Sequence, residues 1–282
     1  MNEADLQAAL IAAGLSHLGK EIDRLARPSI RLSATKADES HMHIGVSKLG
    51  GVPDLPPAKA WPEVKGLPQS FIAQIRLDDI RCYDTEKVLP QSGMLWFFYD
   101  ASRQTFGADP TDRGGWQVLY LNGDLSQLQR TSAPANLPST SQFPACFLGF
   151  ASELTLTWQP SLEIPHLEWT DKAQRQYETV LSTLFSQDDR APHHRLLGFP
   201  DTIQDDMRLQ CQLASHGVTD INDPKTATVS KGAMDWQLLL QVDTDETIGM
   251  RWGNAGMIYY WITSADVRTH QFDASWLVLQ SE

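Results

Sequence analysis

With 282 residues, 41% of them hydrophobic and 21% charged, the chain has the composition of a globular protein of one large domain or two closely joined halves. Its formal net charge of −12 argues against general binding of nucleic acid, which relies on concentrated Lys and Arg. The acidic balance suits a basic protein partner, although a solvated surface that keeps the protein in solution is the more common reason for such a balance.

Three further features bear on the cellular location. The longest apolar runs, such as MIYYWI, are far shorter than the roughly 18 residues of a membrane-spanning helix. Glu3 and Asp5 stand where a secretion signal would carry Lys or Arg. Cys82, Cys146 and Cys211 are too widely spaced for a disulfide framework or a zinc knuckle. We therefore expect a cytoplasmic protein with structural thiols, no membrane span and no cofactor.

Two helices and several strands are predicted along the chain. Apolar residues recur at helical spacing over residues 4–26, and Pro28 would end that helix. A second helix, capped by Thr170, is expected over residues 171–187. Both helices should pack on the sheets. The predicted buried strands are FIAQI, MLWFFY and WQVLYL, then LLLQV, MIYYWI and WLVL, with SIRLSAT and ELTLTW also strand-like.

Four short patterns occur twice in the same order, which indicates an internal duplication. The first copy is LGGVP, FIAQIRLDD, SGMLWFFYD and WQVL, and the second is LGFP, LLLQVDTDE, AGMIYYWIT and WLVL. We predict an N-terminal helix within 1–27, a first repeat half at 28–130, a connector at 131–145 and a second half at 146–282. The expected fold is α+β, internally duplicated, with largely antiparallel sheets and two packing helices in one compact pseudo-twofold unit.

The stretch SKLGGVPDLPPAKAWP, residues 47–62, is dense in Gly and Pro. Gly50 and Gly51 can adopt positive φ, and the prolines hold the chain extended before the first of the apolar strand runs. We interpret the stretch as a connector with a fixed path. The alternative is a turn that cradles an anion with backbone N–H groups, although the ending of a nucleotide-binding loop is missing.

Together with FIAQIRLDD, LLGFPDTIQDDM, CQLAS and FDASWLVLQ, this stretch resembles the YwqG-like family of bacterial proteins, whose function is unknown. The resemblance covers nearly the whole chain from about residue 40 onward. It implies a duplicated α+β fold in a cytoplasmic bacterial protein, and it carries over no catalytic residues. Because some members of the family lie near contact-dependent toxin systems, it also implies an immunity or accessory role.

The second half contains a polar insertion, GFPDTIQDDMRLQCQLASHG, that the first half lacks. If a helix begins at Gln204, then Asp205 and Asp206 simply favour its dipole. The alternative is a binding site for a ligand or partner that includes all three residues. In that case we place a polar pocket at the junction of the halves, where Asp243 and Arg251 would join Gln204 and Asp206.

Other residues carry weaker signals. Asp243, Asp245 and Glu246 follow a buried strand and are interpreted as a strand end turning into solvent; they do not match an EF-hand, and paired carboxylates of a hydrolase remain the alternative. Trp252, like Trp61, lies in loop-like sequence and is a candidate for an exposed binding surface.

A metal site is a further hypothesis. His41 and His43 would share one face of a strand, and His193 or His194 could supply a third ligand for a transition metal. Common catalytic signatures are missing, including the nucleophile elbow and the zinc protease motif. We favour a non-enzymatic binding protein of unknown partner, such as an immunity protein for a basic toxin. The alternative is an enzyme or small-ligand binder with a polar pocket between the halves.

Overall fold

The architecture is taken from a computed structural model, which describes residues 3–57, 59–185 and 191–282. It mixes helices with antiparallel strands, so the predicted α+β class is confirmed. A ten-stranded sheet dominates and is nearly closed on itself. In spatial order its strands are β14 (Trp276–Gln280), β13 (Met257–Thr263), β12 (Trp236–Asp243), β11 (His194–Leu196), β1 (Ala26–Lys36), β10 (Cys146–Leu156), β2 (Lys48–Leu49), β6 (Ser70–Arg76), β7 (Met94–Tyr99) and β8 (Trp116–Leu121).

Short elements connect these strands. Two small sheets pair β3 (Asp54–Leu55) with β9 (Gln129–Arg130) and β4 (Glu63–Val64) with β5 (Leu67–Pro68). The α-helices are α1 (Glu3–Ala12), α2 (Ile22–Leu25), α3 (Leu77–Ile80), α4 (Pro160–Glu163), α5 (Asp171–Phe185), α6 (Met207–Ser215), α7 (Thr226–Val229) and α8 (Ser264–Arg268). The 3-10 turns are η1 (Ser16–Glu21), η2 (Glu39–His41), η3 (Pro110–Asp112), η4 (Leu125–Gln127), η5 (Ser139–Ser141), η6 (Ser230–Asp235), η7 (Glu246–Ile248) and η8 (Phe272–Ala274).

The strands predicted from apolar runs are confirmed. FIAQI, MLWFFY and WQVLYL lie in β6, β7 and β8, and LLLQV, MIYYWI and WLVL lie in β12, β13 and β14. SIRLSAT lies in β1, and the first four residues of ELTLTW end β10. Every residue of β7 is buried, as are nearly all residues of β6, β12 and β13. Burial of both faces explains why these runs are apolar throughout rather than alternating.

The two ends of the sheet meet, which closes the core. The indole rings of Trp116 on β8 and Trp276 on β14 stack edge-to-face with centroids 4.9 Å apart. The Leu279 N–H donates to the Phe106 carbonyl at 3.1 Å. Inside, Tyr260 donates its hydroxyl to the Phe98 carbonyl at 3.0 Å. Residues from both parts of the chain therefore share one core.

A single sheet replaces the separate sheets that we predicted for the two halves. Strand β1 pairs with β10 antiparallel over its full 11 residues, so the first strand of each predicted half joins the two parts. Strand β1 also pairs with β11, and β10 with β2. Each of these two long strands thereby pairs with strands of the other predicted half.

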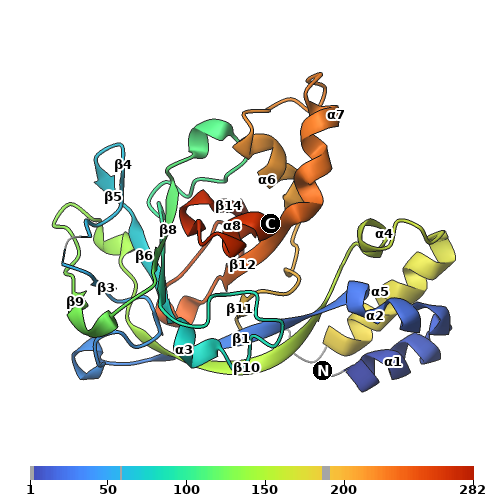
Figure 1. The fold of residues 1–282 in the computed structure, drawn as a ribbon, viewed down its shortest axis with the longest axis horizontal. Coiled ribbons are helices and arrows are strands. Elements are labelled where there is room, and N and C mark those ends of the chain that lie inside the picture. The colour runs from blue at the N-terminus through green and yellow to red at the C-terminus, as the bar shows by residue number, and fades with distance from the viewer. Residues whose placement is uncertain (1–2, 58, 186–190) are drawn as a thin grey trace.

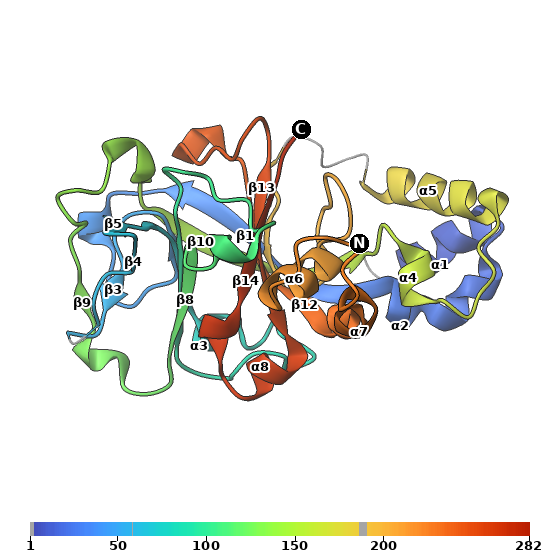
Figure 2. The same ribbon diagram turned by 90° about the horizontal axis from the view of Figure 1, so that it is seen from above.

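The helices form a separate lobe that packs on the sheet only at the ends of β1 and β10, through Ala26 and Leu156, which narrows the prediction. The helical lobe consists of α1, α2, α4 and α5 and lies at one end of the molecule (Figures 1 and 2). Its own core includes Leu6, Leu10, Tyr177 and Leu181, and it is distinct from the main core. The lobe lies away from the main core because β1 and β10 extend beyond their short neighbours β11 and β2. The two long strands form a two-stranded ribbon that carries the lobe.

The continuous helix predicted over residues 4–26 is wrong. Helix α1 ends at Ala12, and Gly14 then adopts φ +75°, which a helix cannot continue through. A 3-10 turn and the short α2 follow before β1 begins at Ala26. Pro28 therefore lies inside a strand. It is tolerated because β11 pairs only with residues 30–32, so Pro28 faces a ladder partner on the β10 side alone.

The second predicted helix is confirmed as α5, Asp171–Phe185. The Thr170 hydroxyl accepts from the Ala173 N–H at 3.2 Å, which is the predicted cap. Residues 186 and 187 of the prediction lie outside the described part of the chain. Within that part, we find no helix with the length and apolar content needed to cross a membrane.

Candidate functional site

Two ionic networks with buried charges lie near the centre of the sheet. Each one holds a loop that contains a tight turn. In the first, which we call the Asp54 network, Asp54 is fully buried and accepts from Gln74 Nε2 at 2.8 Å and Arg130 Nε at 3.0 Å. Gln74 Oε1 in turn accepts from the Asp54 N–H at 2.8 Å. Lys48 is also fully buried, and its Nζ donates to Glu39 at 2.7 Å. These bonds satisfy charges that would otherwise be costly to bury.

The second network, which we call the Asp201 network, repeats this arrangement. Asp201 accepts from Gln241 Nε2 at 2.8 Å, and Gln241 Oε1 accepts from the Asp201 N–H at 2.9 Å. Arg195 pairs with Asp201 at 2.9 Å and with Glu153 at 3.1 Å. Burial alone would raise the pKa of Asp201, but Arg195, with hydrogen bonds from His193 and Gln241, holds it well below its usual range. A Lys or Arg, an Asp and a Gln thus have matching roles in both networks.

Each network lies next to a tight turn of the chain. Gly50 and Gly51 have φ values of +65° and +74°, and Leu197 and Gly198 have +61° and +75°. The Gly50 and Gly51 N–H groups donate to backbone carbonyls at 2.8 Å, so they are not free to cradle an anion. The interpretation of residues 47–62 as a connector with a fixed path is therefore confirmed at its glycines.

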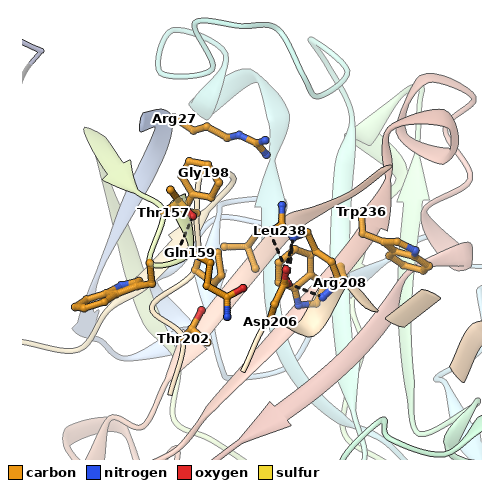
Figure 3. A pocket seen from close by; sticks show the side chains of 13 residues that line it. Arg27, Thr157, Gln159, Gly198, Thr202, Asp206, Arg208, Trp236 and Leu238 are labelled. Atoms are coloured by element: carbon orange, nitrogen blue, oxygen red, sulfur yellow. Dashed lines mark hydrogen bonds and ion pairs between the residues drawn. The ribbon is translucent and has the colours of Figure 1, made fainter. Parts of the chain in front are cut away.

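A groove lies between the helical lobe and the sheet. Its narrow part, the small pocket, has a volume of about 30 Å³. Figure 3 shows Thr157, Gln159 and Thr202 along one side of this pocket and Trp236 on the other. An adjoining cavity of about 250 Å³ shares part of the same walls. The residues that line both spaces are Arg27, Gly198, Trp236 and Leu238.

An ionic bridge joins the lobe to the sheet across the groove. Glu163 on α4 is buried and accepts from Arg208 Nη1 on α6 at 2.5 Å and from Arg27 Nη2 on β1 at 3.3 Å. Arg208 Nη2 also lies 2.8 Å from Asp206, as the dashed lines in Figure 3 mark. Burial lowers the pKa of Arg27, and Glu163 opposes this effect. For Arg208, Asp206 and Glu163 outweigh burial and raise the pKa.

Among the described residues that line the small pocket, Trp261 has a buried polar group without a hydrogen-bond partner. The side chain lines the pocket, its residue is only 3% exposed, and its indole N–H has no hydrogen-bond partner among the described residues. Seven other tryptophans, Trp61, Trp96, Trp116, Trp169, Trp236, Trp252 and Trp276, donate their indole N–H to an acceptor in the protein. A buried indole usually finds such a partner, so the Trp261 N–H is an unsatisfied buried donor in a residue that lines the small pocket.

Of the predicted site residues in the polar insertion, one lines the groove. Asp206 lies in the small pocket, but it also caps α6, where its carboxylate accepts from the Arg208 N–H at 2.9 Å. The helix begins at Met207 rather than Gln204. Gln204 donates its side-chain amide to the Ser281 carbonyl, and Asp205 is exposed next to the pocket.

The other predicted site residues lie elsewhere. Asp243 accepts from the His193 N–H at 2.8 Å, and the exposed Arg251 accepts at its carbonyl from Gln104. No contact among the described residues joins Gln204, Asp206, Asp243 and Arg251 into one pocket. Trp252 is fully buried against Tyr99 and Phe143, so its prediction as an exposed surface is wrong. Trp252 was assigned to a loop because glycines and an Arg surround it in the sequence, although its indole lies in the core. Trp61 is half-buried, with its ring against Phe98.

The predicted histidine pair does not form a strand face. His41 ends η2 and lies 3.6 Å from Asp38, and both His41 and His43 are exposed. Among the described residues there is no group of three or more His, Cys, Asp or Glu side chains placed to hold a metal ion. The backbone turns at η2 because Asp38 caps it, which the alternating pattern HMHIG did not reveal.

Asp245 does not turn into solvent as predicted, because it is buried as the cap of η7. Its Oδ2 lies 3.5 Å from His194 Nε2, and its Oδ1 accepts from the Thr247 N–H at 2.9 Å. His194, followed by Thr247, lowers the pKa of Asp245 to about 2.

We expect Asp245 to contribute to acid sensitivity. Its carboxyl has a folded pKa of about 2, below the roughly 3.9 of an unfolded Asp, so its stabilisation is present above pH ~4 and is lost as the pH falls towards 2. The stability difference between wild type and Asp245→Asn should therefore shrink between pH 5 and pH 3. Urea unfolding at half-unit pH steps would measure it, and a difference that stays constant over this range would contradict the assignment.

Arg27, Glu163 and Trp261 were missed by sequence reasoning. Trp261 sits in MIYYWI, a run whose residues all read as core, and it does lie in the core strand β13. Glu163 reaches partners 136 residues earlier and 45 residues later in the chain. The only sequence signal for the site was the polar insertion that supplies Asp206 and Arg208.

Comparison with known proteins places the chain in a family. Residues 47–281 match the model of a family described as Domain of unknown function (DUF1963). The match covers most of the chain, so the protein belongs to this family of unknown function. A search of curated proteins finds no match.

Proposed function

We propose that this protein is a non-enzymatic binding protein and that its ligand occupies the groove between the helical lobe and the sheet. The observation that carries the proposal is the buried indole N–H of Trp261, which lines the small pocket and lacks a protein acceptor among the described residues. An unpaired buried donor is costly, and a bound acceptor would remove that cost. This site lies between lobe and sheet, not between the two predicted halves.

The lining of the small pocket favours binding over catalysis. Its described residues include no His, Cys or Lys, the side chains that most often transfer protons or attack a substrate near neutral pH. Its one carboxylate, Asp206, accepts from Arg208 and caps α6. The ionic bridge through Glu163 keeps lobe and sheet together, so both walls of the groove are already positioned.

Filling the small pocket should abolish ligand retention. Thr202 lines the pocket, so Thr202→Trp should exclude a bound molecule, whereas Thr140→Trp at an exposed position of η5 should not. We would purify wild type and both variants from the source cells and compare small-molecule adducts by native mass spectrometry. We expect an adduct on wild type and Thr140→Trp, reduced at least tenfold in Thr202→Trp. Equal retention in all three, or no adduct in any, would refute the proposal.

A protein partner is the second candidate, including an immunity or accessory role for a bacterial toxin. Trp158, which lines the small pocket, is 44% exposed, Leu162 on α4 is 42% exposed, and Asp205, next to Asp206 in the chain, is exposed as well. Apolar anchors beside carboxylates suit a basic protein. Affinity capture at low salt from the source cells tests this. Asp205→Asn is the variant to compare, because Asp206→Asn would also remove the cap of α6.

We further propose that the two parts of the chain arose by internal duplication, with the YwqG-like relationship and cytoplasmic bacterial setting that the resemblance implies. Support comes from the two ionic networks. Lys48 and Arg195, Asp54 and Asp201, and Gln74 and Gln241 make equivalent bonds. The domain boundaries at 28–130 and 146–282 remain predictions.

A further inference from the structure

We infer that the outer edge of strand β10 is a homodimer interface, at which a second copy of this chain adds its own β10 antiparallel across a twofold axis. The inference goes beyond the ligand groove and does not depend on it. It rests on backbone groups of β10 that have no partner within the described part of the chain, and on neighbouring side chains that are complementary to those of a second copy.

The ladder between β1 and β10 determines which backbone groups of β10 face outward. It keeps one register over all 11 residues of both strands. At its two ends, and in the same register, the Ala37 N–H donates to the Ala145 carbonyl at 3.0 Å and the Thr157 N–H donates to the Leu25 carbonyl at 2.9 Å. The N–H and C=O of one residue in an antiparallel strand point to the same neighbouring strand, and those of the next residue point away from it. The odd-numbered residues of β10 therefore bond to β1, and the even-numbered residues direct both groups outward.

Strand β2 covers only the beginning of this outward edge. It pairs with Cys146 and Phe147 and then ends. Farther along, Leu148, Phe150 and Ser152 direct their N–H and C=O groups outward, and these groups have no hydrogen-bond partner among the residues that the structure describes. Leu148 and Phe150 are half-buried and Ser152 is exposed, and Figure 1 shows β10 along the lower border of the molecule. The partner that satisfies such a row of groups is another extended strand.

The sequence of this edge has none of the usual features that prevent pairing. Residues 147–152 read FLGFAS, with no charge and no proline. Natural strand edges are commonly protected by Lys, by Pro or by charges that point inward. The chain carries a net charge of −12, yet the nearest acidic residue, Glu153, is paired with Arg31 and Arg195. Two copies can therefore meet along this edge without repulsion between like charges at the paired residues.

The edge is complementary to itself, which favours a second copy over an unrelated strand. Antiparallel pairing centred on Phe150 bonds Leu148 of each copy to Ser152 of the other, so all three outward residues are used. Gly149 then lies opposite Ala151, and both are exposed and small enough for the two strands to approach closely. Phe147, which is 40% exposed, becomes the diagonal neighbour of Ala151 in the second copy. A twofold pairing of this kind is closed and adds no third copy.

Sedimentation velocity of the full chain at increasing concentration tests the interface. The buffer contains a reducing agent, because Cys82 is exposed and would otherwise be able to form disulfides between copies. We expect a monomer–dimer equilibrium with a dissociation constant of about 1–100 µM, since pairing of one strand edge gives a small interface. Ser152→Pro removes an outward N–H and leaves the ladder to β1 intact, so it should weaken the dimer at least tenfold. Ser152→Ala keeps that N–H and is the matched control, which should dimerise like wild type.

Ala151→Glu is a second variant that needs no change of the backbone, so the test is still decisive if proline disturbs the strand. Ala151 is exposed, and in the paired edges the two copies of this residue are diagonal neighbours. Two carboxylates at these positions repel each other, and we expect the dimer to weaken about tenfold or more at low salt. Ser182→Glu, at an exposed position of α5 in the helical lobe, adds the same charge elsewhere and should leave the dissociation constant unchanged.

Amide hydrogen exchange followed by NMR identifies the surface directly. In concentrated samples the Phe150 and Ser152 amides should exchange more slowly than in dilute ones, whereas the Gly149 and Ala151 amides, which bond to β1 in either state, should not change. Three outcomes would overturn the inference: a wild-type chain that stays monomeric up to about 500 µM, a dimer that Ser152→Pro and Ala151→Glu both leave unchanged, or a dimer without slower exchange at Phe150 and Ser152. The first of these would leave the edge to a strand of a different protein, and the second would place the dimer contact on another surface.

Discussion

Asp54→Ala is expected to lower the free energy of unfolding by about 3–5 kcal/mol, the usual effect of removing one member of a buried ionic network. The Asp54 carboxylate is fully buried and accepts from the Gly45 N–H, Gln74 Nε2 and Arg130 Nε, while Lys48 Nζ lies 3.7 Å away. Alanine removes the Asp54 carboxylate from all of these donors, although Gln74 Nε2 also donates to the Val46 carbonyl. Lys48 is the most affected, because its ammonium is fully buried as well and keeps only Glu39.

Urea unfolding of the full chain at neutral pH measures this loss. Asp201→Ala in the second network should fall in the same range, because Arg195 is equally buried and loses the closer of its two carboxylates. Asp109→Ala is the matched control. Asp109 caps η3 at an exposed position, so its loss should cost only about 1 kcal/mol. An Asp54→Ala protein no less stable than Asp109→Ala would mean that the network is not a stabilising unit.

The strands were predictable because their signal is local. A run such as MLWFFY is apolar at every position because every position of β7 is buried, and no distant information is needed to see that. The cap at Thr170 and the turn at Gly50 and Gly51 are equally local, since each depends on the conformation of a few neighbouring residues. These features account for the correct part of the fold prediction.

The lobe and the groove were not predictable for the opposite reason. The apolar residues of α1 and α5 indicate that each helix buries some of its side chains, but not what covers them. Here the two helices cover each other, as Leu10 and Leu181 show. The groove depends on Arg27, Glu163 and Arg208, which lie far apart in the sequence and meet only because the fold brings α4 of the lobe next to α6. The prediction for Trp252 was wrong for a similar reason, because the glycine-rich sequence around it does not indicate that the residue lies in the core.

Gly107→Ala is expected to lower the free energy of unfolding by about 3–5 kcal/mol. Gly107 has φ +74°, where a residue with a Cβ costs about 1–2 kcal/mol. A Cβ at this position would also lie 1.7 Å from the Leu277 carbonyl oxygen, which belongs to the backbone of β14 and cannot turn away. Relief requires the 105–108 loop to move off β14. That movement removes two hydrogen bonds worth about 1 kcal/mol each, Leu279 N to Phe106 O and Trp276 Nε1 to Gly107 O.

Gly66→Ala separates the two contributions. Gly66 has nearly the same φ, +77°, but a Cβ there would meet nothing within 4 Å, so only the backbone cost of about 1–2 kcal/mol applies. Urea unfolding followed by tryptophan fluorescence would compare the two variants. Similar losses would show that the contact with β14 contributes little. A much larger loss at Gly107 would show that closure of the sheet, in which a loop after β7 covers β14, stabilises the core shared by both parts of the chain.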